Sequence, residues 1–153
     1  MRYSKQRTKS TCGPVAIFNA LKWAGVSGSY RKIVPRLKRA CRTEHYPKGT
    51  YSWVLHEVLK KEMKRVGVSV ELRWSISQKS LLKNLTKNKS VIISYSHKKG
   101  GGHYGLVIKG TKNYPFKTIN FYSDTPATYK RTRRKFYRHH GQRIRMAWIL
   151  TKK

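Results

Sequence analysis

An apolar run near the N-terminus, over residues 15–24, constrains the fold of this chain most strongly. Its apolar side chains recur at helical spacing, and Gly25 follows at the position where glycine commonly ends a helix. Pro14 suits the first turn of such a helix, because no backbone donor is missed there. The pattern therefore predicts a buried helix with Cys12 at its N-terminal end.

The position of Cys12 suggests chemistry. Unpaired N–H groups and the positive end of the helix dipole stabilise a thiolate, and thiolate is the form of cysteine that attacks a carbonyl carbon. A buried free cysteine beside a core helix is the competing structural interpretation. The choice between the two depends on partner residues elsewhere in the chain.

Length and composition limit the class of protein. The 153 residues, 38% of them hydrophobic, predict one domain over residues 1–153 with one core. No apolar run is long enough for a membrane span, and the N-terminus lacks the apolar block of a signal peptide. We therefore expect a cytoplasmic or nuclear protein that is not secreted by a signal peptide.

The charge is far from balanced. Lys and Arg number 36 against 5 Asp and Glu, a formal net charge of +31. The positive charges repel one another, and this repulsion is tolerated where polyanions are near. We therefore expect nucleic acid as a partner, and packaging in a virus particle is one expected location. Basic composition as a solubility or genome-wide trait is the alternative.

The two cysteines form no metal-binding pattern. Cys12 and Cys41 make no C-x-x-C motif and no Cys/His cluster with zinc spacing, so we expect no metal and no cofactor. A disulfide between them is one alternative, but it would consume the proposed nucleophile. We favour free thiols in a reducing compartment.

The order of the predicted elements indicates an α+β fold, because helices come first and an antiparallel sheet follows. Pro35 is expected to shorten or kink the second helix. The helices are expected over residues 15–24, 30–41, 52–67 and 77–88, and the strands over 68–74, 89–96, 103–108, 118–122 and 145–150.

A cysteine nucleophile needs a base, and His103 is the best candidate among the histidines. It follows a glycine-rich segment and begins an apolar strand, where a side chain is held rigidly beside a cleft. His97 is the second choice. The remaining four are expected to be peripheral or solvated: His45, His56, His139 and His140.

The base needs an orienting group, and the oxyanion needs a donor. Asp124 is the only aspartate and follows the strand after His103, although a turn or helix cap is an equal interpretation of this residue. Asn120 is the alternative orienter. Gln6 lies upstream of Cys12 at a spacing that lets its amide reach the oxyanion, together with the backbone N–H of Cys12.

These residues, in this order, resemble the papain-like cysteine peptidases that process bacteriocin leaders, the double-glycine-leader peptidase family. The similarity covers most of the chain, including residues 77–94. The resemblance implies a papain-like fold with N-terminal helices packed on a C-terminal antiparallel sheet, and a polypeptide substrate. It also implies roles for four residues: Cys12 as nucleophile, His103 as base, Asp124 as orienter and Gln6 as oxyanion donor. Thr125 separates Asp124 from Pro126, so Asn120 stays open as the orienter.

A basic segment over residues 129–140 interleaves cations with aromatic residues. Such a segment can neutralise phosphates and stack on bases without reading sequence. A solvated helix face and a targeting signal are the alternatives. The cations expected to bind nucleic acid are Lys130, Arg131, Arg133, Arg134, Lys135 and Arg138.

The sequence thus leads to a cysteine peptidase with a Cys-His-Asp triad and a basic surface for nucleic acid or another polyanion. The alternative is a non-catalytic basic structural or packaging protein on a peptidase-like fold. A deamidating or transglutaminase-like enzyme uses the same set of residues.

Overall fold

Helices and strands segregate along the chain as the sequence predicts. The computed structural model describes residues 2–45, 48–96, 102–121, 126–141 and 143–153. The elements are the helices α1 (Cys12–Trp23), α2 (Tyr30–Ala40), α3 (Ser52–Arg65), α4 (Gln78–Lys83) and α5 (Arg133–His140), and the strands β1 (Val68–Ser77), β2 (Lys89–Ser96), β3 (Gly102–Lys109), β4 (Phe116–Ile119), β5 (Thr128–Arg131) and β6 (Arg143–Lys152).

The strands form one six-stranded sheet in the order β1-β6-β2-β3-β4-β5. Every neighbouring pair is antiparallel. The last strand of the chain, β6, lies between β1 and β2, so that Trp148 pairs with Leu72 on one side and Ile92 on the other. These pairings confirm the predicted α+β class with an antiparallel sheet.

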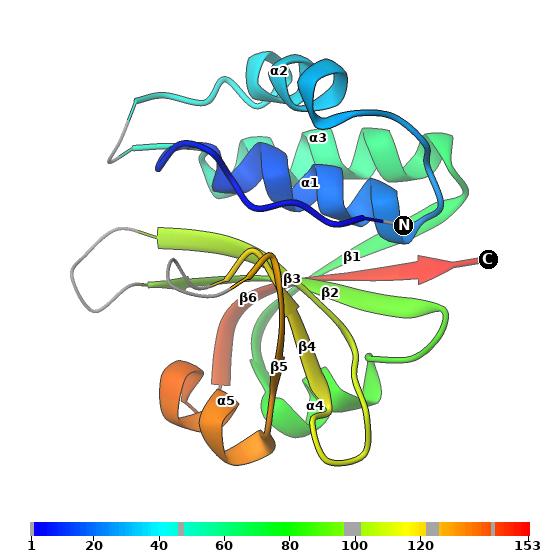
Figure 1. Ribbon diagram of the computed structural model, residues 1–153, viewed down its shortest axis with the longest axis vertical. Helices are drawn as coiled ribbons and strands as arrows, with labels where there is room; N and C mark the ends of the chain where they lie inside the picture. Colours follow the sequence, from blue (N-terminus) through cyan, green and yellow to red (C-terminus); the bar gives the residue numbers. More distant parts are fainter. Residues whose placement is uncertain (1, 46–47, 97–101, 122–125, 142) are drawn as a thin grey trace.

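The helices cover both faces of the sheet in two layers (Figure 1). α1, α2 and α3 lie over one face, and α4 and α5 lie against the other. Alternate residues of each strand supply the two cores, as the pleat requires: Ile92 faces the large helical layer, whereas Val91 and Ile93 face the smaller one. No helix in the described ranges is long and apolar enough to cross a membrane.

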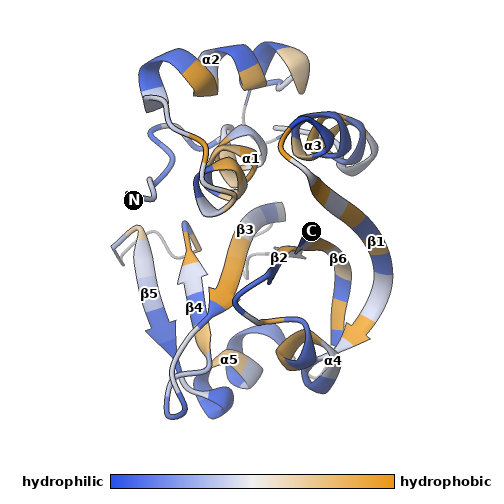
Figure 2. Ribbon diagram, turned by 90° about the vertical axis from the view of Figure 1, so that its right-hand side faces the viewer, coloured by the Kyte–Doolittle hydropathy of each residue, from blue (hydrophilic) through white to orange (hydrophobic). Residues whose placement is uncertain are grey.

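α1 is the centre of the helical layer. Figure 2 shows it between α2 and the sheet, with α3 beside it. Val15, Ala16 and Ile17 are fully buried, and almost every residue of the helix is shielded from water. A helix apolar all round must be enclosed on all sides, and the predicted buried helix is confirmed.

Several element bounds differ from those predicted, and the strand expected over 118–122 is β4, Phe116–Ile119. α2 runs through Pro35, whose missing N–H leaves a carbonyl on the exposed side of the helix, where water can satisfy it. α4 ends at Lys83 instead of continuing to residue 88. β5 and α5 were not assigned as elements from the sequence, because both consist mainly of charged and polar residues. Phe136 is the one buried side chain of α5.

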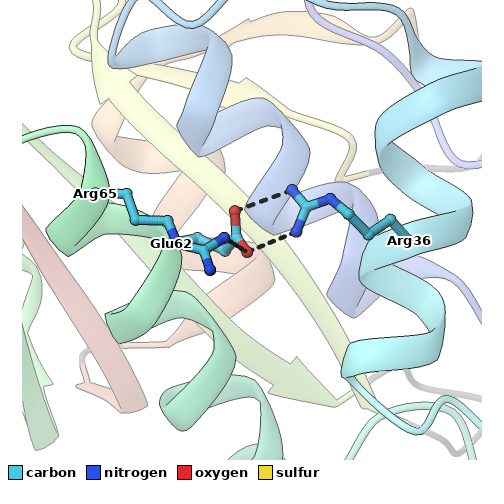
Figure 3. A network of polar contacts seen from close by, with 3 residues as sticks. All are labelled: Arg36, Glu62 and Arg65. Atoms are coloured by element: carbon cyan, nitrogen blue, oxygen red, sulfur yellow. Dashed lines mark hydrogen bonds and ion pairs between the residues drawn. The ribbon is translucent and has the colours of Figure 1, made fainter.

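A buried carboxylate joins α2 to α3 (Figure 3). Glu62 accepts two hydrogen bonds from Arg36, at 2.7 and 3.0 Å, and lies 3.3 Å from Arg65 Nη1. The bidentate bonds from Arg36 hold the pKa of Glu62 below its usual value, against a smaller opposing effect of burial. The bridge therefore fixes the outer helix on the inner pair.

We expect Glu62→Gln to destabilise the protein by about 2 kcal/mol at neutral pH, since Arg36 then loses its charged partner. Because the folded pKa of Glu62 lies below the unfolded value, the carboxylate stabilises the fold above pH ~4.5 and this contribution is lost as pH falls through the folded pKa. Urea unfolding at pH 7 and at pH 4 measures both effects.

Glu57→Gln is the matched control, because Glu57 lies on the same helix, is exposed and has no ion pair within the described ranges. A difference between wild type and Glu62→Gln that stays constant down to pH 3 contradicts the assignment.

Candidate active site

The thiol of Cys12 lies where α1 meets the start of β3. Cys12 is the first residue of α1 and is 6% exposed. Its sulfur is hydrogen-bonded by backbone groups of Tyr104, Gly13 and Cys12 itself, so it lies beside the residue that follows His103. Figure 1 shows the N-terminal end of α1 and the start of β3 on the same side of the molecule.

Two opposing effects act on this thiol. Burial raises the pKa of Cys12 above its ordinary value, and the three backbone hydrogen bonds lower it by less. The helix N-terminus therefore does not by itself create a thiolate here, which the sequence pattern had led us to expect. Burial thus favours the protonated thiol of Cys12.

His103 is the second residue of β3 and is 7% exposed. It pairs in register with Tyr95 on β2, and the two ring centroids lie 5.3 Å apart. The His103 Nε2 atom lies 2.5 Å from the backbone oxygen of Asn120. A carbonyl only accepts, so Nε2 carries the proton, and in the neutral ring Nδ1 is then the basic nitrogen.

Successive side chains of β3 point to opposite faces of the sheet. Tyr104 packs in the same apolar cluster as Cys12, under the large helical layer, whereas His103 lies on the side of Tyr95. The hydrogen bond between the sulfur and the Tyr104 backbone nevertheless places Cys12 at the same end of β3 as His103.

Asn120 supplies the oxygen that orients His103. It directly follows β4, is 2% exposed, and has a left-handed backbone with φ 58°. Its Oδ1 accepts from the backbone N–H of Gln6 at 2.9 Å, and its Nδ2 donates to Gln6 Oε1 at 3.0 Å. This clamp fixes Asn120, so that its main-chain carbonyl faces the imidazole.

Gly105 allows this arrangement. A Cβ at Gly105 would lie 2.1 Å from the ring of Phe121, the residue after Asn120. The ring therefore packs directly on the backbone of β3, two residues from His103. Tyr95 donates from its hydroxyl to the Phe121 carbonyl at 2.6 Å, which holds the segment after β4 against β2.

The side chain of Gln6 has a structural role in this conformation. Its Nε2 donates to the carbonyls of Thr8 and Lys9 at 3.0 and 3.4 Å, within the turn that precedes α1. Donation to an oxyanion therefore requires this turn to release Gln6. Asp124 and His97 lie outside the described residues.

The other candidates are held apart from this site or play other parts. Cys41 ends α2 in the core, where burial, together with Glu62, raises its pKa to about 12. Both cysteines are free. His140 is half-buried against Phe136 and Tyr95, which contradicts the expected solvation, whereas His139 is exposed as expected.

Burial first, and then the neighbouring cations, lower the pKa of His140 to about 3. His140 is therefore uncharged at physiological pH.

Sequence reasoning missed the contacts that fix the end of α1. A Cβ at Gly13 would lie 2.7 Å from Thr50 Oγ1, so the helix terminus packs tightly on the segment before α3. The Tyr104 hydroxyl donates to the Thr50 carbonyl at 2.9 Å and lies 3.0 Å from Ser52 Oγ. The signal available in the sequence was the Gly-Pro step, which leaves no side chain at that point.

A cleft of about 790 Å³ adjoins the site. Gly102 and Tyr95 line it, and they connect it to His103. Its other walls come from the start of α3 and from β1 and β6, and they carry Trp53 and Trp74. No group of three or more His, Cys, Asp or Glu residues in the described part of the chain could hold a metal ion.

No protein-family model matches the sequence, and comparison with curated proteins finds no significant match. Solved structures match over the whole chain. The peptidase domain of Streptococcus ComA, a bifunctional ABC transporter of a quorum-sensing pathway, is 16% identical with a TM-score of 0.69, and the match covers 99% of this chain and 100% of that domain.

Two further solved structures are similar. A double-glycine-motif protease from an AMS/PCAT transporter, solved in complex with its leader peptide, is 12% identical, with a TM-score of 0.67 over 99% of this chain and 91% of that one. A C39-like peptidase from Bacillus anthracis is 13% identical, with a TM-score of 0.64 over 99% and 94%. The chain therefore has the papain-like fold of double-glycine-leader peptidase domains, as the resemblance predicted.

Proposed function

We propose that the protein is a cysteine peptidase that acts on a polypeptide substrate, with Cys12 as nucleophile and His103 as base. One observation carries the proposal: the Cys12 sulfur lies at the backbone N–H of Tyr104, next to a histidine whose Nε2 is held by the Asn120 carbonyl. Acyl transfer by a cysteine needs a nucleophile, a base and an orienter, and we assign these roles to Cys12, His103 and Asn120.

The reaction follows from these positions. The His103 Nδ1 takes the thiol proton while the sulfur forms a bond to the substrate carbonyl carbon, and the carbonyl oxygen becomes an oxyanion. The backbone N–H of Cys12, joined by Gln6 when its turn releases it, stabilises that oxyanion. The imidazolium then protonates the leaving amine, and water, deprotonated by the same ring, hydrolyses the thioester.

The raised pKa of Cys12 selects between two forms of this mechanism. A preformed thiolate–imidazolium pair requires a lowered thiol pKa, whereas burial raises the pKa of Cys12. We therefore propose that the Cys12 thiol is neutral before the reaction and loses its proton to His103 as attack begins. The same steps serve a deamidating enzyme, in which a side-chain amide is attacked and ammonia leaves, and a transglutaminase, in which an amine instead of water then attacks the thioester.

The charge favours a second function, binding of a polyanion such as nucleic acid by the surface of residues 129–140. In α5, Phe136 is buried and stacks on Phe116 at 4.0 Å, which anchors the helix. Arg133, Arg134, Lys135 and Arg138 are exposed and form no ion pair within the described ranges. Lys130 and Arg131 precede them on β5.

A cationic helix of this kind neutralises phosphates without reading bases. It fits the proposed peptidase and equally the alternative of a basic packaging protein, which keeps the surface and lacks turnover.

We expect the alkylation rate of Cys12 by iodoacetamide to be low at neutral pH and to rise continuously beyond pH 9, since only the thiolate reacts and burial raises its pKa. Mass-spectrometric peptide mapping after quenched reaction gives the rate. Cys41 is the internal control, because it is fully buried and its pKa of about 12 keeps it unlabelled in the folded protein. A rate plateau below pH 7 would indicate a preformed ion pair and contradict the neutral-thiol mechanism.

We expect Cys12→Ala and His103→Ala to lower peptide cleavage by about 10³-fold or more, because each removes a group that the chemical step requires. A peptidyl vinyl sulfone labels the wild type and fails on Cys12→Ala. Circular dichroism confirms that each variant is folded. Cleavage that survives Cys12→Ala refutes the peptidase proposal, and folded wild type that neither cleaves nor is labelled favours the packaging protein.

The orienter is tested by comparing Asn120→Ala with Asp124→Ala. Loss of the Asn120 side chain releases the clamp on Gln6 and lowers kcat by about tenfold or more, with a smaller change in KM. A loss confined to Asp124→Ala identifies the carboxylate as the orienter instead.

We expect the exchange of Arg133, Arg134, Lys135 and Arg138 for glutamine to weaken duplex DNA binding and to lower the slope of log K against log salt by about 3 to 4. Fluorescence anisotropy at several salt concentrations measures the slope. The matched control removes equal charge from Arg31, Lys32, Lys38 and Arg39, which are exposed on α2 at the opposite side of the molecule. Equal losses in both variants would show that only net charge matters.

A further inference from the structure

The cleft beside the candidate active site exposes two tryptophans. Trp53, in the first turn of α3, and Trp74, near the end of β1, are each 66% exposed and line the same cavity. The other two of the four tryptophans, Trp23 and Trp148, are buried in the core. Tyr51 stacks on Trp53 with 6.4 Å between ring centroids and 18° between ring planes, which extends the aromatic surface.

Large aromatic rings left in water cost hydration free energy, and a pair of them in one cleft indicates a partner with flat faces. The volume of about 790 Å³ lies in the range of ordinary ligand pockets, about 300 to 1,000 Å³.

Cations from β6 line the same cleft. Arg143 and Arg145 both contribute to its wall, and Glu57 is the one carboxylate among its lining residues. Arg143 is fixed in place, because its Nε donates to Ser75 Oγ at 2.9 Å and its Nη2 to the Ser75 carbonyl at 2.6 Å. The cleft thus combines stacking surfaces with a positioned positive charge.

The backbone of β1 is unusual at this point. Ser75 has a left-handed φ of 55°, which is uncommon for a residue other than glycine. The turn of the backbone there leaves Leu72 in contact with the large helical layer and sends Ile76 into the opposite cluster. Trp74 lies directly before this change of face, so the strained residue and its two bonds from Arg143 help to fix the exposed ring.

The basic segment reaches the cleft. His139 and His140, the last residues of α5, line it, so the C-terminal end of this basic helix borders the same cleft as the tryptophans. Together with the net charge of +31, this selects an anionic partner over a neutral one.

We propose that this cleft binds single-stranded nucleic acid, with bases stacked on Trp53 and Trp74 and phosphates held by Arg143 and Arg145. Single strands offer free base faces to aromatic side chains, whereas the bases of a duplex are already stacked on one another. The proposal extends the polyanion binding proposed for α5 and does not depend on peptidase activity.

The test measures binding of fluorescein-labelled oligo(dT) of about 20 nucleotides to the full chain by anisotropy. Trp53→Ala and Trp74→Ala are each expected to weaken binding by about tenfold, and Arg145→Gln to weaken it less. Tyr114→Ala is the matched control, since Tyr114 is similarly exposed at 46% and lies outside the cleft. Binding of a duplex of equal length is expected to be unchanged in the two tryptophan variants.

A second readout uses the tryptophans themselves. Because only Trp53 and Trp74 are exposed, oligo(dT) is expected to quench intrinsic fluorescence and to protect the remaining emission from acrylamide. Thermal melts establish that both variants are folded. We expect both to fold, because the two substitutions lie at exposed positions.

Three outcomes overturn the proposal. Oligo(dT) binding unchanged in both tryptophan variants refutes it. An equal loss for oligo(dT) and duplex also refutes it, because the tryptophans then do not depend on the free base faces of a single strand. Labelling of Cys12 by a peptidyl probe that is lost in the tryptophan variants while oligo(dT) binding persists assigns the cleft to a peptide. Cys12→Ala is expected to bind oligo(dT) like wild type, so failure of the peptidase proposal leaves this test intact.

Discussion

The contact between the first turn of α1 and the start of β3 sets the rest of the structure. Gly13 lets the helix terminus pack on Thr50, and Tyr104 bonds from β3 to the Thr50 carbonyl and approaches Ser52, where α3 begins. These contacts fix two helices and the sheet at one point. Cys12 lies at that point, so the position of its sulfur follows from core packing and needs no flexible loop.

This rigidity has an electrostatic consequence. The same packing that places the sulfur also removes it from water, and burial outweighs the backbone donors in setting the thiol pKa. A thiol buried in this way is shielded from oxidation, and as the proposed nucleophile it would depend on a neighbouring base for activation. The clamp between Asn120 and Gln6 then matters because it fixes the carbonyl that accepts from His103, the proposed base.

Local patterns predicted much of the fold. Three patterns depend only on near neighbours: the apolar spacing of α1, the alternation along β1, and the apolar runs of β2 and β3. Each of them predicted the correct type of element. Cys12 and His103 could be proposed from the sequence because each lies at the start of such an element. The Asn120 carbonyl could not be assigned, since its position depends on a left-handed backbone and on Gln6, 114 residues away. The cleft was missed because Trp53 and Trp74 come from separate elements that meet only in the folded chain.

The cleft and the candidate active site share a boundary, so a ligand bound in the cleft lies close to the candidate active site. Gly102 lines the cleft and His103 follows it directly; Tyr95 lines the cleft and its ring also contacts His103. The cleft proposed for nucleic acid therefore has in its wall the residue that precedes the proposed base. Excess positive charge, which peptide hydrolysis does not require, gathers at α5 and leads to this same rim. The surface proposed for polyanion binding and the site proposed for thiol chemistry are thus adjacent, and the negative charge of a polyanion in the cleft would act on both.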